Sequence, residues 1–214
     1  MAIIEKSIFG KISGKLGNML VYERKGKTVI KSFPAKSSRP PSAKQLYHRE
    51  AFKVGQKFLT PLRAELEFGF AKSNPVQSQG ISRALSVLLK TAILNEGDKP
   101  VLYPEKVKIS EGDLLGIESP TAEWVDGNLL QLTWFPNAFL GHAKEADRLV
   151  VVAYDPETGR KWSVLKGNYR KSGLQQIQFP WSGDLQGRFY IYLSFFAEVS
   201  GRKEFSDSVC LGRV

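Results

Sequence analysis

Residues 148–154, Arg148-Leu-Val-Val-Val-Ala-Tyr154, are the stretch of sequence that decides the fold. The run is rich in β-branched side chains, which favour a strand. Alternate residues of a strand point to opposite faces, so Leu149 belongs to one face and Val150 to the other, and both faces are apolar. Residues 188–196 repeat this pattern. We therefore expect both strands to lie in a sheet that is covered on both of its faces.

Further strands are predicted around these two, separated by turn signals such as Asp126-Gly-Asn128 and Asp155-Pro-Glu-Thr-Gly159. The additional candidates are Thr121–Val125, Leu129–Phe135, Lys161–Lys166, Leu174–Phe179 and Glu204–Leu211. Seven short strands at this spacing predict an antiparallel β-sandwich. A plain sandwich leaves one face of each sheet in water, so the second apolar face needs a cover. The N-terminal helices and a second subunit are the two candidates.

The N-terminal part of the chain reads as a hairpin followed by helices. Residues 19–24 and 27–33 flank a glycine turn, and pairing Arg24 with Lys27 sets the register of the predicted hairpin. Ser42-Ala-Lys-Gln45 has the spacing of a helix capping box. The helix that follows meets a breaker at Pro61.

A second helix is predicted over residues 81–92, ending near Gly97. The expected fold class is therefore α+β. A β-hairpin and two or three helices pack on a C-terminal antiparallel seven-strand β-sandwich.

Positive charge is concentrated near the start of the chain. The whole protein carries 31 Lys and Arg against 21 Asp and Glu, a net charge of +10. Residues 1–63 alone carry 14 cations against 3 acids. This asymmetry favours two structural units, a basic hairpin and helical unit at residues 1–100 and a β-sandwich at residues 101–214. It also suggests that the N-terminal unit faces a polyanion, or simply forms a solvated basic surface.

A polyanion-binding surface would use cations from the hairpin through the start of the first helix. Tyr22, Phe33 and Tyr47 are interleaved with these cations, either to stack on bases or to fill the core. No signature of sequence-specific nucleic-acid recognition is present. The candidate phosphate-binding residues are Lys11, Lys15, Arg24, Lys25, Lys27, Lys31, Lys36, Arg39, Lys44 and Arg49.

Residues suited to catalysis or metal binding are scarce. Cys210 is the single cysteine, and it lies in an apolar strand, where a thiol behaves as a small hydrophobe. His48 and His142 are the only histidines, and neither has a recognisable acid–base partner nearby in the sequence. We therefore predict no catalytic residue, no metal site and no cofactor, and we do not expect an enzyme.

No targeting segment is evident. The first ten residues contain no apolar run of the kind a secretory signal needs, and no stretch of about 20 apolar residues is present. The 42% hydrophobic and 24% charged fractions exclude a polytopic membrane protein and a wholly disordered chain. We expect a cytoplasmic protein, with export inside a phage-like particle left open.

The C-terminal part resembles a fibronectin type III-like module. The resemblance is carried by Leu130-Gln-Leu-Thr-Trp134 before Pro136, by Val150–Asp155 before a turn, and by Tyr190–Leu193 with Ser206–Val209. Such modules are usually interaction units, so the resemblance implies a binding role.

Nearly the whole chain is similar to an uncharacterised family of bacterial proteins found chiefly in Bacteroidota. The carrying motifs are Ser13-Gly-Lys-Leu-Gly-Asn18, Lys25-Gly-Lys27, Pro41–Gln45, Ala153–Pro156 and Ser208–Gly212. This resemblance implies no activity and no site residue.

Two functions remain open. The first is a non-catalytic structural, assembly or protein-interaction role, with a protein partner or self-association through the extra apolar face of the sandwich or through the basic hairpin. The alternative is sequence-independent nucleic-acid binding through the basic N-terminal segment. Neither function involves a membrane or a small-molecule substrate.

Overall fold

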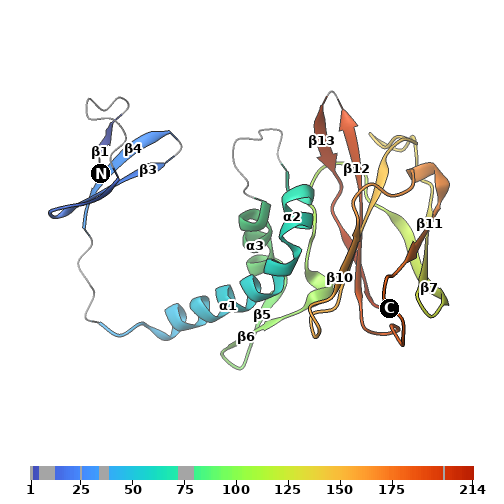
Figure 1. Cartoon of the computed structure of the whole chain (residues 1–214), viewed down its shortest axis with the longest axis horizontal. Helices are drawn as coiled ribbons and strands as arrows, with labels where there is room; N and C mark the ends of the chain where they lie inside the picture. Colours follow the sequence, from blue (N-terminus) through green and yellow to red (C-terminus); the bar gives the residue numbers. More distant parts are fainter. Residues whose placement is uncertain (1, 5–12, 25, 34–38, 72–79, 200) are drawn as a thin grey trace. The chain divides into compact units, whose positions relative to one another are not determined.

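A computed structural model describes residues 2–4, 13–24, 26–33, 39–71, 80–199 and 201–214. The chain divides into two compact units, Met1–Ser42 and Ala43–Val214 (Figure 1). This division differs from the one expected at residue 100. The helices that follow Ser42 bury their apolar side chains against the C-terminal sheet, so they belong to the same unit as that sheet.

The N-terminal unit is a four-stranded antiparallel sheet in the order β1-β4-β3-β2. The central hairpin has the predicted register, with Arg24 opposite Lys27 and Tyr22 opposite Val29. Two short edge strands that the sequence did not reveal complete the sheet. The four strands are β1 (Ala2–Ile4), β2 (Gly14–Leu16), β3 (Met19–Arg24) and β4 (Lys27–Ser32).

The second unit begins with its helical part. Pro61 lies in a 3-10 turn, η1 (Thr60–Leu62), that separates the first two helices, as expected for a residue without a backbone N–H. Gly97 does not cap a helix as predicted, but forms the turn of a small hairpin. The remaining elements here are α1 (Ala43–Leu59), α2 (Arg63–Gly69), α3 (Gly80–Thr91), β5 (Ile93–Glu96) and β6 (Lys99–Leu102).

Two antiparallel sheets form the rest of this unit. The three-stranded sheet has the order β11-β8-β7, and the five-stranded sheet has the order β10-β9-β12-β13, with β14 also paired to β12. The strands are β7 (Glu118–Asp126), β8 (Leu129–Phe135), β9 (Arg148–Tyr154), β10 (Lys161–Val164), β11 (Leu174–Gln178), β12 (Tyr190–Val199), β13 (Arg202–Phe205) and β14 (Val209–Arg213). Short 3-10 turns are η2 (Pro104–Lys106) and η3 (Arg170–Ser172).

The two sheets share a hydrophobic core. Leu130 and Leu132 of β8 meet Val151 of β9 and Ile191 of β12 in one cluster of buried side chains. The other face of β8 carries polar side chains such as Gln131, so the three-stranded sheet keeps one wet face, as antiparallel sheets commonly do.

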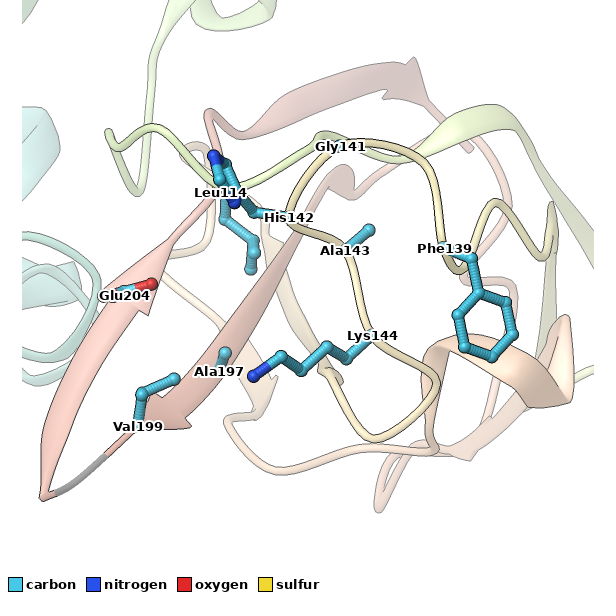
Figure 2. Close-up of a pocket in the computed structure, with 9 residues that line it drawn as sticks. All are labelled: Leu114, Phe139, Gly141, His142, Ala143, Lys144, Ala197, Val199 and Glu204. Atoms are coloured by element: carbon cyan, nitrogen blue, oxygen red, sulfur yellow. The ribbon is translucent and has the colours of Figure 1, made fainter.

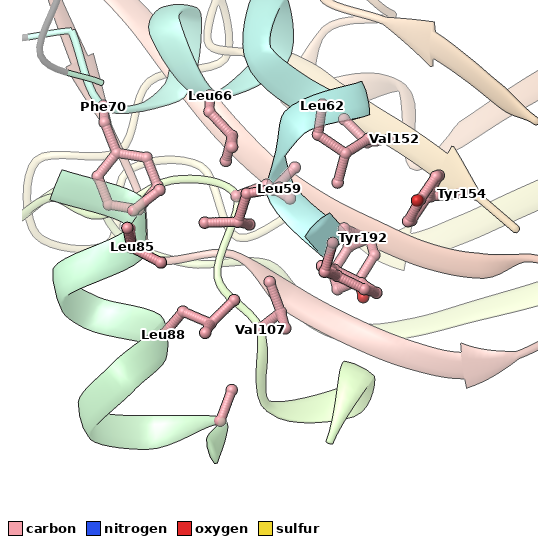
Figure 3. Packing of buried hydrophobic residues seen from close by; sticks show 14 of the residues in the cluster. Leu59, Leu62, Leu66, Phe70, Leu85, Leu88, Val107, Val152, Tyr154 and Tyr192 are labelled. Carbon is pink, nitrogen blue, oxygen red and sulfur yellow. The ribbon is translucent and has the colours of Figure 1, made fainter. Parts of the chain in front are cut away.

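The second apolar face of the five-stranded sheet is covered by the helices. Leu59 and Leu62 pack with Val152, Tyr154 and their neighbours in a second buried cluster (Figure 3). The expectation that β9 and β12 need a cover on both faces is confirmed, and the chain's own helices provide it.

Candidate functional site

The pairing register places the described cations of the N-terminal sheet on one face. Side chains directly opposite each other on neighbouring strands share a face. Arg24 lies opposite Lys27, while Leu20 lies opposite both Lys15 and Lys31. Since residues 20 and 24 of one strand point the same way, all four cations project from the same side of the sheet. We call this surface, formed by Lys15, Arg24, Lys27 and Lys31, the basic face.

The opposite face of the N-terminal sheet is mainly apolar. It carries Leu16 and Met19, whose side chains are 61% and 45% exposed, together with Val21 and Ile30. Glu23 is also on this side, one residue before Arg24. No carboxylate lies on the basic face among the residues that the structure describes. The basic face also carries Leu20, Tyr22 and Val29, so apolar side chains lie on both faces of the sheet, whereas its described cations lie on one.

Two lysines of the N-terminal unit form cation–π contacts with aromatic rings. The Nζ atom of Lys31 lies 5.6 Å from the ring centroid of Tyr22, and that of Lys15 lies 4.7 Å from the centroid of Phe33. These cation–π contacts orient the ammonium groups. They also occupy the rings that were candidates for base stacking. The third aromatic candidate, Tyr47, packs against the core of the helical part.

The remaining predicted cations are distributed over both units. Arg39 is exposed just before the helical part, and Lys44 and Arg49 are exposed on α1. Lys11, Lys25 and Lys36 lie outside the described residues. The structure thus brings four of the ten predicted residues together on one face. The sequence prediction also stopped at Arg49, although the next two turns of α1 expose Lys53 and Lys57.

A pocket of about 380 Å³ lies between the β8–β9 loop and the β12–β13 hairpin (Figure 2). His142, Lys144 and Glu204 line it, and Lys144 extends toward Ala197. Within the described part of the chain, none of these three side chains hydrogen-bonds to another. A nucleophile or general base is usually oriented by such a hydrogen-bonded partner.

The buried charges of the second unit have structural partners. The Arg170 side chain is fully buried, and its Nε atom donates a hydrogen bond to the Asp147 carboxylate at 3.0 Å. One Nη atom donates to Asn137 Oδ1 at 2.6 Å, and the other donates to the Leu115 carbonyl at 2.8 Å. The guanidinium also lies 3.9 Å from the ring centroid of Phe195. Asn137 and Asp147 sit at the two ends of the β8–β9 loop, so this network fixes the loop.

Two other side chains with reactive groups are Glu65 and Cys210. The buried Glu65 carboxylate accepts hydrogen bonds from Lys161 Nζ at 2.8 Å and Ser163 Oγ at 3.0 Å, which ties α2 to β10. Burial raises the pKa of the Cys210 thiol to about 11, so the group is protonated at neutral pH and a poor nucleophile.

The described residues contain no group of three or more His, Cys, Asp or Glu side chains that could hold a metal ion. None of the helices described here combines the length and the apolar character that crossing a membrane requires.

Comparison with known proteins finds a matching protein family. Residues 11–212 match a family described as a family of unknown function, DUF6266. No curated protein matches the sequence.

Proposed function

We propose a function from the structure, because the chain belongs to the DUF6266 family and that family has no known function. The protein is a non-catalytic nucleic-acid binder that contacts the phosphate backbone through the basic face of its N-terminal sheet. The observation that carries this proposal is the alignment of Lys15, Arg24, Lys27 and Lys31 on one side of the sheet.

Several features favour phosphate contacts over base contacts. Arg24 and Lys27 lie directly opposite each other on the basic face, and an anion bound there would lower the repulsion between their like charges. Tyr22 and Phe33 already hold lysines, which leaves the cations as the groups that meet the ligand. Contacts to phosphate fix position and carry no sequence information. We therefore expect binding that is independent of sequence and sensitive to salt.

Assembly remains the second candidate, for a different reason from the one the sequence offered. The extra apolar face of the five-stranded sheet is covered by α1–α3, so it is not a contact surface. The apolar face of the N-terminal sheet, with exposed Leu16 and Met19, is the surface that favours self-association. Concentration-dependent mass in light scattering, lost in the Leu16→Gln/Met19→Gln variant, would support this candidate.

We further propose that the second unit is a fibronectin type III-like sandwich. In immunoglobulin-type sandwiches the second strand lies beside the fifth, and the third pairs with the sixth. Counting β7 to β12 as the first to sixth strands gives the same pairs, since β8 lies beside β11 and β9 lies beside β12. The fourth strand, β10, pairs with β9. Three further proposals are independent of this fold. We propose that the protein originates in the Bacteroidota, that Ser13–Asn18 is a signature of its family, and that the protein is cytoplasmic.

Fluorescence anisotropy of a labelled random-sequence duplex tests the proposed function. In the Lys15→Gln/Arg24→Gln/Lys27→Gln/Lys31→Gln variant, the slope of log affinity against log salt should become shallower by about 3.6, because each phosphate contact contributes about 0.9. The control removes the same number of exposed cations from the second unit: Lys90, Lys99, Lys166 and Arg188 to Gln. Equal slopes for the two variants would refute the basic face as the binding site.

A further inference from the structure

We propose, on the basis of the proposed nucleic-acid binding, that α1 carries a second site and that this site takes a single strand. Arg49, Lys53 and Lys57 contact consecutive phosphates, and Phe52 stacks on a base. This site lies in the second unit, so it is separate from the basic face of the N-terminal sheet.

The three cations form a stripe along one side of α1. They are four residues apart, which places them on successive helical turns about 6 Å apart along the axis. All three are exposed, and none forms an ion pair with a carboxylate in the described part of the chain. α1 contains a single acidic residue, Glu50. Glu50 lies three residues before Lys53 and is its neighbour on the helix surface, so the stripe has three cations beside one acid. A row of cations of this kind is the electrostatic complement of a phosphate backbone.

Phe52 is placed next to this stripe and is open to solvent. It follows Arg49 by three residues, so these two side chains are neighbours on the helix surface, and the residue is 46% exposed. Tyr22 and Phe33 on the N-terminal sheet are each covered by a lysine, but no cation or second ring covers Phe52 among the residues described. Aromatic side chains flanked by cations are the stacking platforms of single-strand binders. A duplex keeps its bases stacked on each other and offers no free face to such a ring.

A groove beside Phe52 leaves room for the stacked base. It has a volume of about 420 Å³ and runs between α1 and α3, with Leu85 among its apolar lining. Gln56 and Arg63 line the same groove and supply hydrogen-bond donors for the polar edge of a base. Charge on the stripe, an open ring and a groove with polar groups thus adjoin on one helix.

The test compares a labelled oligothymidylate with a duplex of the same length, using the full chain. Phe52→Ala should weaken single-strand binding about 5- to 150-fold, the range for losing one stacked base, and leave duplex binding unchanged. Phe52→Trp, which keeps a ring, should retain the affinity. Phe139→Ala removes a phenylalanine that is 79% exposed on the β8–β9 loop, and it serves as the matched control.

The charged stripe has its own readout. The Arg49→Gln/Lys53→Gln/Lys57→Gln variant should reduce the single-strand salt slope by about 2, since each contact contributes about 0.7 on single strands. Circular dichroism confirms that each variant keeps its helices.

The inference is overturned if Phe52→Ala behaves like Phe139→Ala, or if it weakens duplex and single strand equally. Competition by poly-glutamate as strong as that by unlabelled oligothymidylate would also overturn it, because the surface would then suit an acidic protein segment. If only the variant of the basic face loses its salt slope, the α1 site is wrong and the proposed function stands. If neither the basic-face nor the α1 variant changes the slope, both fail.

Discussion

Replacing Arg170 with methionine should destabilise the second unit strongly. The substitution keeps much of the side-chain volume but removes every hydrogen bond that the guanidinium donates. The Asp147 carboxylate, nearly fully buried, would lose its cation, and Asn137 Oδ1 and the Leu115 carbonyl would lose their donors. Breaking a buried ion pair from one side costs about 3–5 kcal/mol, so we expect a loss of about 4 kcal/mol. For a unit of this size that corresponds to a fall in Tm of about 8–16 °C.

Tryptophan fluorescence isolates this effect, because Trp124, Trp134, Trp162 and Trp181 all belong to the second unit. Urea unfolding of the full chain followed at this signal reports that unit alone. Lys171→Met is the matched control. Lys171 is the next residue, and its exposed ion pair with Glu145 spans 3.7 Å and should contribute about 1 kcal/mol or less.

A second variant separates charge burial from packing. Arg170→Met/Asp147→Leu removes both charges, and replacing a buried pair with apolar side chains is often nearly neutral. The double variant should therefore regain part of the stability that the single variant loses. The reasoning is refuted if Arg170→Met costs no more than Lys171→Met.

Two smaller effects on stability follow from the same unit. Burial alone would raise the pKa of Asp155, but hydrogen bonds from the Thr158 side chain and nearby backbone N–H groups outweigh it and hold the pKa below its ordinary 3.8. Asp155→Ala should therefore lower the free energy of unfolding by about 1–2 kcal/mol at pH 7, as measured by urea unfolding. This difference from the wild type should shrink as the pH falls below 3.8, because protonation of Asp155 removes the same stabilisation. A difference that persists at low pH would contradict this prediction. At Gly112 a Cβ atom would lie 2.1 Å from the Phe205 carbonyl oxygen, so Gly112→Ala should lower the free energy of unfolding by about 1–3 kcal/mol. Gly127→Ala is the control and should change the Tm little, because no atom lies within 4 Å of the added carbon.

Much of the strand pattern was readable from local sequence. Leu129–Phe135 and Arg148–Tyr154 are strands with the predicted bounds, because their β-branched and alternating residues satisfy the requirements of a strand without help from distant parts. The two-sided apolar pattern of residues 148–154 also indicated correctly that a cover exists. Apolar side chains favour burial, so a strand that is apolar on both faces indicates that both faces are covered.

Long-range contacts account for what the sequence did not show. The predicted strand Glu204–Leu211 is divided between β13 and β14, because Ser206 turns its hydroxyl oxygen to accept from the Phe195 N–H while the Phe205 carbonyl bonds to Leu114. The partner Leu114 lies about 90 residues earlier in the chain, where no local pattern points to it. Gly97 was expected to cap a helix, yet with Asp98 it adopts left-handed backbone angles and turns a hairpin.

In the candidate sites, too, local sequence patterns predicted some features, and contacts distant in sequence determined others. The hairpin register, predicted from Arg24 and Lys27, was sufficient to align those two cations, whereas Lys15 joins them through an edge strand that is too short to recognise. The stripe on α1 did have a sequence signal, since Arg49, Lys53 and Lys57 recur every four residues. Phe52 lies outside the buried positions of α1, which include Ala51, Gly55 and Phe58, and the sequence analysis did not single it out.

The most direct test of the central claim is the salt dependence of binding between the wild-type protein and a labelled random-sequence duplex. The log of the association constant should fall linearly with the log of the salt concentration, with a slope of about −3.6 or steeper for the four cations of the basic face. Absence of binding at low salt, or a slope near zero, would contradict the claim. The segregated charge of the N-terminal sheet would then be a solvated or protein-docking surface.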